Sequence, residues 1–503
     1  MRSQTFFKHA IVYGAGSMLL QAAGFILLPI YTRYLSPSAF GMLEVSARMG
    51  EVVTICLMLP GIRVASHAFY KQVEDDQERR RVVSSALILV FAVAAAATCI
   101  LMLTAGPLAH AVGITSPSIL RLAFLVVMFE AIATIPLVIA QARLESGFYV
   151  GTTFFQFLIK VSLGILFVVG FQWGIWGVLL ASVLTSATFA IGLTVREFSK
   201  GLARPSGAML REMLRFGSPF IAGGLGYFLL HDGDRFFILH YSGEAAVGVY
   251  AFGYKIARLV SLFSREPLQT VWAAHMYDVA KEPEAPAVFG RAFSRIMGVY
   301  VMVGLALCLL QDEVTGLLGG RAYAAATRLL APIVLAYAFL AAAEIMDSGF
   351  YVRRKTHVKF WITLASTSIM LALYAVLIPK FGIEGAAFAT LLGFLFNAWL
   401  TWKVSQRAFP VAYEFKRLVG MLGLAALYWG ISRLLPISYW MVPAKVGLWL
   451  LWVATLWSFG IISVDEKVWI SGNVNNLIAR VSQLFPSRRF RRVVVANQEC
   501  PEI

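Results

Sequence analysis

Three charged side chains interrupt an apolar segment near the start of the chain. Glu44, Arg48 and Glu51 follow one another at helical spacing, so one face of a helix carries all three. The order of Glu44 before Arg48 favours an ion pair along that helix. A charge inside an apolar segment is costly and therefore usually faces other helices or a wet cavity. These residues could bind an anion, or they could join helices by ion pairs.

Other apolar segments carry further ionisable side chains, which could line the same cavity. The basic ones are candidates for substrate binding, because guanidinium and ammonium groups donate hydrogen bonds to oxyanions. The acidic ones and a histidine are candidates for a gate or for ion coupling. The binding candidates are Arg48, Lys160, Arg235, Lys255 and Arg258, and the gate or coupling candidates are Glu51, Glu130, His231, Asp232 and Asp234.

The same residues also allow a structural interpretation. Interhelical ion pairs of Glu51 with Arg258, or of Asp234 with Arg235, would act as gates or hold a helix bundle together. Basic and acidic groups are nearly balanced in these segments. Net positive charge alone therefore does not select an anion, and the sequence leaves both interpretations open.

Two acid–base assignments have equally ordinary alternatives. His231 beside Asp232 could relay protons, but a histidine near a helix break is more often a satisfied polar group. Glu130 could couple transport to an ion, or it could be a protonated carboxyl held between helices. The chain has no Walker motif, no HExxH and no metal-ligand spacing among its four cysteines. We therefore expect no metal, no cofactor and no enzymatic activity.

The elements that position these residues are those of an all-α polytopic membrane protein. Of the 503 residues, 59% are hydrophobic and only 14% are charged, whereas about 25% are charged in soluble domains. The apolar blocks are about 20 residues or longer, enough to cross a bilayer. We predict about fourteen transmembrane helices, at 10–34, 39–62, 83–105, 118–140, 148–170, 174–195, 216–240, 246–266, 290–311, 326–347, 359–379, 383–403, 416–435 and 443–463.

The net charge of +16 reports on membrane topology. Most of the 43 Lys and Arg residues fall in loops on the side that holds the N-terminus. This bias predicts that both termini are cytoplasmic, and it explains the basic composition without a nucleic-acid partner. The first apolar block, which continues to Ile30, is too long for a cleavable signal peptide.

An internal repeat relates the two halves of the predicted bundle. Gly41 in FGML matches Gly248 in VGVY, and the turn WGIWG matches FGIEG. The pentapeptide SGFYV occurs at both Ser146–Val150 and Ser348–Val352, which we align with each other. Because six helices separate the copies, both halves enter the membrane in the same direction. This predicts a parallel repeat about an axis along the membrane normal.

The repeat divides the chain into four expected parts. These are a six-helix bundle at 1–200, a second six-helix bundle at 201–410, two extra helices at 411–463 and a basic amphipathic cytoplasmic tail at 464–503. The tail would lie on the lipid surface, unless it is simply a disordered basic segment. In the repeat Lys255 matches Arg48, so both bundles place charge on the same helix face.

Five segments resemble a known transporter family. They are Leu28–Gly41, Pro60–Tyr70, Arg215–Ile221, Asp234–Lys255 and Phe381–Ala387. Their order and spacing resemble those of the polysaccharide or O-antigen (Wzx-like) flippases of the multidrug/oligosaccharidyl-lipid/polysaccharide exporter superfamily. The resemblance covers the first twelve helices and implies a MATE-like V of two bundles around a central cavity.

The resemblance also implies a function. It implies transfer of an undecaprenyl-diphosphate-linked oligosaccharide from the inner to the outer leaflet of the bacterial plasma membrane, for O-antigen, capsule or exopolysaccharide synthesis. The implied partners are this lipid-linked glycan, membrane lipids, a polysaccharide polymerase and a chain-length regulator. Two alternatives from the same superfamily are a cation-coupled multidrug or small-molecule exporter and a cell-wall precursor flippase. The exporter is less favoured, because the first helix has no carboxylate.

Overall fold

The computed structural model of the chain describes residues 26–459. In that range it consists of helices joined by short connections and has no β-strand. Residues 26–34 are helical and lead into the first labelled helix. The elements are α2 (Pro37–Cys56), α3 (Leu59–Gln72), α4 (Asp76–Val112), α5 (Pro117–Ala142), α6 (Ser146–Ile165), η1 (Leu166–Gly170), α7 (Gly174–Ser199), α8 (Gly207–Gly217), α9 (Pro219–Asp232), α10 (Asp234–Val279), α11 (Ala285–Leu309), α12 (Gln311–Gly319), η2 (Arg321–Ala326), α13 (Thr327–Met346), α14 (Ser348–Val352), α15 (Thr356–Ala408), α16 (Phe415–Ser432), η3 (Tyr439–Met441) and α17 (Val442–Ser458).

Ten of the described helices are long and apolar enough to cross a membrane, or eleven if the bent pair α2 and α3 forms one span. The all-α membrane fold is thus confirmed, while the count of fourteen stays a prediction. The predicted first helix at 10–34 lies only partly within the described residues. The predicted tail at 464–503 lies outside them.

Two of the longest helices each contain the break between two predicted spans. Gly243 interrupts α10 with φ 81° and ψ 176°, and Gly382 interrupts α15 with φ 57° and ψ −133°. Glycine adopts positive φ readily because it has no Cβ. Gly174, the repeat partner of Gly382, has nearly the same φ of 56°. The two copies of this predicted turn therefore share the positive φ of their glycine, although Gln172 also has a positive φ in the first copy only.

The predicted helix at 39–62 is in fact two helices. α2 and α3 meet at a 50° bend, and Met58 between them has a left-handed φ of 58°. The cause is Pro60, which has no N–H to donate to the carbonyl of Cys56 and whose ring would clash with that carbonyl in a continuous helix. α3 therefore starts afresh, with the proline in its first turn.

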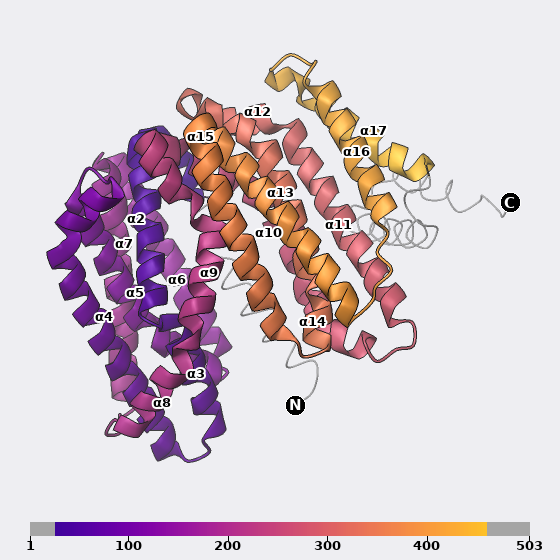
Figure 1. Cartoon of the computed structure of the whole chain (residues 1–503). Coiled ribbons are helices and arrows are strands. Elements are labelled where there is room, and N and C mark those ends of the chain that lie inside the picture. The colour runs from indigo at the N-terminus through magenta and orange to yellow at the C-terminus, as the bar shows by residue number, and fades with distance from the viewer. Residues whose placement is uncertain (1–25, 460–503) are drawn as a thin grey trace, which may run out of the picture.

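The helices fall into two groups that meet along α2 and α10 (Figure 1). α4, α5 and α7 pack together with α2, and α13 packs with α10 and α15. α8, which follows the predicted boundary at residue 200, packs on α3 and α4. α9 contacts both α2 and α15, and it lies between the two groups in Figure 1.

The two repeat glycines touch each other where α2 crosses α10. A Cβ added to Gly41 would lie 1.9 Å from the carbonyl oxygen of Glu244, and one added to Gly248 would lie 1.9 Å from that of Pro37. Gly41 thus faces a carbonyl one helical turn before Gly248, and Gly248 faces a carbonyl one helical turn before Gly41. Such reciprocity is what a two-fold relation between the copies produces.

The pentapeptide SGFYV was aligned wrongly. Its first copy opens α6, whereas its second copy forms α14, before the next long helix begins. The turn that does correspond has a residue with left-handed φ in each half, Leu144 (61°) and Arg354 (56°). Leu144 precedes the first copy and Arg354 follows the second. The two identical pentapeptides therefore occupy different structural positions.

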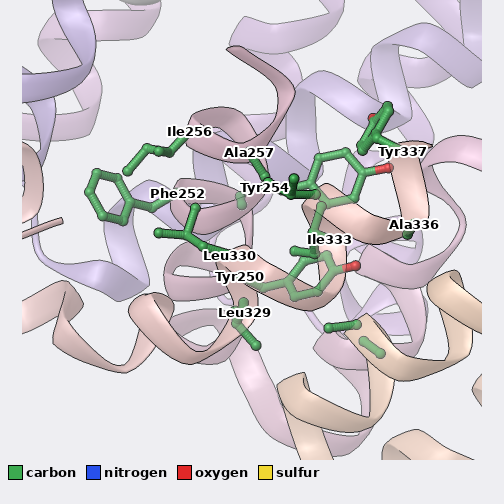
Figure 2. Close-up of a cluster of buried hydrophobic side chains, with 14 of the residues drawn as sticks. Tyr250, Phe252, Tyr254, Ile256, Ala257, Leu329, Leu330, Ile333, Ala336 and Tyr337 are labelled. Atoms are coloured by element: carbon green, nitrogen blue, oxygen red, sulfur yellow. The ribbon is translucent and has the colours of Figure 1, made fainter. Parts of the chain in front are cut away.

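A cluster of buried aromatic and aliphatic side chains fixes the part of α10 that follows the crossing (Figure 2). Side chains of α10 and α13 interlock there, and the Tyr254 and Tyr337 rings meet edge to face at 5.5 Å. In lipid, such close packing rather than the hydrophobic effect holds helices together. The labelled members are Tyr250, Phe252, Tyr254, Ile256 and Ala257 of α10 and Leu329, Leu330, Ile333, Ala336 and Tyr337 of α13.

The extra helices are fixed to the second group by charge. Lys445 of α17 is buried, and its Nζ lies 2.8 and 2.9 Å from the two carboxylate oxygens of Glu313 in α12. Arg433, just after α16, pairs with Asp312. α16 and α17 both pack on α11.

Candidate functional site

Charged residues of α2 meet those of α9 and α10 where these helices cross. Arg48 Nη1 lies 3.3 Å from Asp232 Oδ1, and Lys255 Nζ lies 2.7 Å from Glu44 Oε2. Residues far apart in the sequence thus form one set, which we call the crossing network. Its members are Glu44, Arg48, Glu51, Asp232, Asp234, Arg235 and Lys255.

Glu44 is the hub of the crossing network. Its carboxylate is 5% exposed and faces three cations: Lys255 Nζ at 2.7 Å, Arg48 Nε at 3.4 Å and Arg235 Nε at 3.8 Å. The predicted pair of Glu44 with Arg48 is therefore confirmed, as part of a larger set. A buried charge is tolerated only when it is paired, so each cation here stabilises Glu44 and is stabilised by it.

Asp234 and Arg235 form the most buried part of the crossing network. Arg235 Nη1 lies 2.7 Å from Asp234 Oδ1, and the Tyr250 hydroxyl donates to Asp234 Oδ2 at 2.6 Å. The Arg235 guanidinium also lies 4.3 Å from the centre of the Tyr254 ring, within cation–π range. The predicted pairing of Asp234 with Arg235 is confirmed, but both residues belong to α10, so this pair does not join two helices as expected. Contact of Arg235 with a ligand stays a prediction.

Arg48 is the network arginine with access to solvent. Its side chain is 23% exposed, and Nη1 lies 2.6 Å from Glu51 Oε2 as well as close to Asp232. Glu51 is 41% exposed. The planar guanidinium of Arg48 presents its donors in a fork that fits carboxylate and phosphate oxygens.

A cavity of about 490 Å³ adjoins the crossing network inside the first group of helices. Side chains from residues 27–31, α2, α5, α6, α7 and α10 line it. Four of the predicted site residues share this cavity: Glu51, Glu130, Lys160 and Lys255. Two amines thus face the same space as two carboxylates within a lining that is otherwise mostly apolar, so the cavity is mixed in charge.

The remaining predicted residues lie around the network. His231 is 9% exposed, and its ring stacks near those of Tyr227 (4.1 Å) and Phe394 (5.6 Å). Its backbone carbonyl accepts hydrogen bonds from Arg235 and Tyr254. Arg258 is exposed on α10. A proton relay through His231 and substrate contact by Arg258 stay predictions.

The sequence was compared with known proteins. Residues 6–273 match the sequence profile of a family described as polysaccharide biosynthesis proteins. The chain belongs to this family. It is also 19% identical over 266 residues to the probable low-salt glycan biosynthesis flippase Agl15 of Haloferax volcanii, a match that spans 52% of this chain and 56% of that protein. The resemblance inferred from the sequence segments is thereby confirmed.

Solved structures share the fold of this polysaccharide biosynthesis protein. A lipid II flippase, MurJ, in an inward closed conformation matches 92% of this chain and 100% of its own, with a TM-score of 0.74 and 11% identity. An inward-facing multidrug resistance MATE family transporter of the MOP superfamily matches 79% of this chain and 97% of its own, with a TM-score of 0.60 and 15% identity. At such identities the likeness establishes the fold alone.

Reasoning from sequence missed three parts of the site in this family member. Glu44 was recognised only as a partner of Arg48, although its place on the same helix face signalled a wider role. Tyr250 and Tyr254 were not singled out, because a tyrosine in an apolar segment gives no sign of where its hydroxyl points. Among residues 26–459, no three His, Cys, Asp or Glu side chains cluster as metal ligands would.

Proposed function

We propose that this protein is a flippase that moves a polyprenyl-diphosphate-linked oligosaccharide repeat unit from the cytoplasmic to the outer leaflet of a bacterial inner membrane, without enzymatic chemistry. The observation that carries the proposal is the crossing network at the junction of the two repeated helix groups, beside a cavity that holds two amines and two carboxylates. Membership of the polysaccharide biosynthesis family supports it. Both termini would be cytoplasmic, as the basic loops predict.

The crossing network would bind the diphosphate by exchange of partners. In the present conformation its cations are paired with internal carboxylates. A diphosphate would replace Glu51 at Arg48 and approach Lys255 and Lys160 from the cavity. Arginine suits this role because its fork can bond two phosphate oxygens. Because the cations of the network are already paired with its own carboxylates, a small anion that accepts fewer hydrogen bonds than a diphosphate would displace them less readily.

The two helix groups would move against each other about the contact of Gly41 with Gly248. We propose that 1–200 and 201–410 are the moving units and that 411–463 travels with the second, because Lys445 and Glu313 fix the extra helices to it. The cavity of about 490 Å³ is within the range of a drug-sized site. A whole repeat unit therefore requires these units to separate on the cytoplasmic side.

A deletion strain tests the proposal. Loss of the gene should cause lipid-linked repeat units to accumulate unflipped and surface glycan to disappear, and the intact gene should reverse both effects. Normal surface glycan in a clean deletion would rule the function out. A polysaccharide polymerase and a chain-length regulator are the protein partners we propose.

Two arginine variants test the site. Arg48→Ala and Arg258→Ala should reduce glycan export while the protein persists in the membrane. Normal export by both variants would reject the substrate-binding assignment. Loss of both variants from the membrane would show that these charges serve the structure instead.

A cell-wall precursor lipid is the second candidate substrate. It is the substrate named for the solved lipid II flippase, whose fold is shared over 92% of this chain. Such a function would make the gene essential for growth, whereas a polysaccharide function makes it essential only for the surface glycan. Viability of the deletion strain separates the two.

A cation-coupled exporter is the third candidate. Glu51 and Glu130 in the cavity are carboxylates that an organic cation could contact. Dye efflux driven by a proton or sodium gradient would favour this function. Equal dye retention by the wild type and the deletion strain would exclude it.

A further inference from the structure

A second cavity, of about 330 Å³, lies at the far ends of the first group of helices. It shares no lining residue with the cavity beside the crossing network. It is formed where α3 ends, α4 begins, α5 turns into α6, and α7 ends. All of these segments are predicted to be cytoplasmic, so we call it the rim pocket. Its charged lining residues are Arg79, Arg80, Arg143, Lys200, Asp76, Glu145 and Glu197.

Two carboxylates of the rim pocket, the buried Glu197 and the half-buried Glu145, are already neutralised. Arg143 Nη1 lies 2.8 Å from Glu197, which is only 1% exposed, and Lys200 Nζ lies 3.1 Å from Glu145. Arg196, just outside the pocket, pairs with Glu145 at 2.5 Å and with Glu197 at 3.3 Å. Three basic residues therefore surround two carboxylates, which leaves the base of the pocket positive.

Two more arginines add to this positive charge. Arg79 has Asp76 at 3.6 Å, but that aspartate is 88% exposed, and so open a pair contributes little. The Arg79 and Arg143 guanidinium carbons each lie 5.6 Å from the centre of the Tyr70 ring. Tyr70 thus holds two like charges at one site. Their repulsion would be relieved by an anion.

The last arginine of the rim pocket, Arg80, packs beside Gly201, which has no side chain. Its Nη1 would lie 3.1 Å from a Cβ at Gly201, a residue with φ 81°. Glycine at this position both permits the turn after α7 and leaves space for the guanidinium. A side chain there would push Arg80 away from the pocket.

The surroundings of the rim pocket are those of a membrane surface. Leu144 beside Glu145 is 40% exposed, and Phe198 beside Glu197 is 60% exposed. Three helices long enough to cross a bilayer have one terminus here: α5 and α7 end at the pocket, and α6 begins there. The pocket therefore lies at the depth where helices leave the hydrocarbon and meet lipid headgroups.

The second helix group does not repeat this arrangement. At the turn that corresponds to Leu144, Glu145 is replaced by Lys355. In the alignment of WGIWG with FGIEG, Glu197 corresponds to Ser405, which donates instead to the Met346 carbonyl. The rim pocket is thus a property of one group and not a general consequence of the fold.

We propose that the rim pocket binds the phosphate group of an anionic membrane lipid, with Arg79, Arg80 and Arg143 as its donors. Charge-assisted hydrogen bonds from guanidinium groups are the strongest ordinary contacts to phosphate. Basic pockets between helices at the cytoplasmic surface are suited to anionic headgroups. The acyl chains would lie along Leu144 and Phe198. This site is independent of the flippase proposal.

The test is a titration of the purified full-length protein in uncharged detergent with a short-chain phosphatidylglycerol. Parallel titrations use the matching phosphatidylcholine and inorganic phosphate. Arg80→Gln should weaken phosphatidylglycerol binding about fivefold, since one basic group near such a headgroup contributes about 1 kcal/mol. Arg80→Lys should restore most of the affinity. Arg204→Gln is the matched control, because this arginine is exposed in the following loop and does not line the pocket.

Each result decides the question. Binding of phosphatidylglycerol that Arg80→Gln weakens and Arg204→Gln leaves intact supports the site. Unchanged binding by Arg80→Gln, equal loss in Arg204→Gln, or equal affinity for phosphatidylcholine overturns it. If inorganic phosphate binds with the same affinity and displaces the lipid, the pocket is a free-phosphate site and the lipid assignment is wrong.

Discussion

Replacing Gly41 by alanine would force α2 and α10 apart. The new methyl group would start 1.9 Å from the Glu244 carbonyl oxygen, and ordinary contact begins at 3.4 Å, so the helices must separate by about 1.5 Å. A gap of that size forfeits most of the dispersion contact along the crossing. It also stretches the hydrogen bond from Ser38 to Glu244, now 2.9 Å. Overpacking of this kind costs about 1–3 kcal/mol.

The cost should appear as a shift between closed and open arrangements of the two groups. A change of about 1–3 kcal/mol corresponds to about 5–150-fold in that equilibrium. Spin labels at Tyr34 and Arg321, which are exposed near the crossing, would report the fraction of separated molecules. Gly192→Ala is the matched control, because a Cβ at that helical glycine meets nothing within 4 Å.

The reciprocal contact of Gly41 and Gly248 leads to a second prediction, about Gly248 and about the double variant. Gly248→Ala should behave like Gly41→Ala, because its Cβ meets the Pro37 carbonyl at the same 1.9 Å. One separation of the helices relieves both clashes, so the double variant should cost clearly less than the sum of the single variants. Additive costs, or a Gly41→Ala variant as harmless as Gly192→Ala, would refute this account of the crossing.

Three other expectations concern charge. Glu44→Gln leaves three cations without their shared buried partner, so it should lower the unfolding temperature far more than Glu51→Gln does. Breaking a buried ion pair costs about 3–5 kcal/mol, whereas breaking an exposed pair costs about 0–1 kcal/mol. Equal shifts in unfolding temperature would contradict the role of Glu44 as the hub. Lys445→Met should destabilise similarly by stranding Glu313, and adding Glu313→Leu should restore stability; no rescue would argue against the pair. At Glu145, burial favours a raised pKa, but hydrogen bonds from its two basic partners outweigh it and lower the pKa. The stabilisation is therefore present above the ordinary glutamate pKa and is lost as the pH falls through the lowered value, so Glu145→Gln should flatten the fall in unfolding temperature on acidification.

The sequence was sufficient for those features that one helix encodes by itself. Apolar blocks predicted the spans, and the spacing of Glu44 and Arg48 predicted their pair. Gly382 was expected at a turn, and the absence of a Cβ permits its positive φ. Such features depend on local geometry, which the order of residues determines directly.

Features that depend on contacts between helices were mostly beyond prediction. Identical letters misled the alignment of Ser146–Val150 with Ser348–Val352, because packing rather than identity sets the register of the turns. The role of Glu44 as a shared partner depends on where α10 crosses α2. The bend at Met58 was foreseeable, since Pro60 rarely lies within a continuous helix.

The charge balance of the crossing has a consequence for energy coupling. When all are ionised, the network and its cavity carry four positive and five negative side chains. They are Arg48, Lys160, Arg235 and Lys255 against Glu44, Glu51, Glu130, Asp232 and Asp234. Moving one elementary charge through a membrane potential of 100 mV takes about 2.3 kcal/mol. The single net negative charge at the centre of the empty carrier would make its return step sensitive to the membrane potential, by at most this amount for a full crossing of the field. The anionic diphosphate would add its own charges to the loaded step.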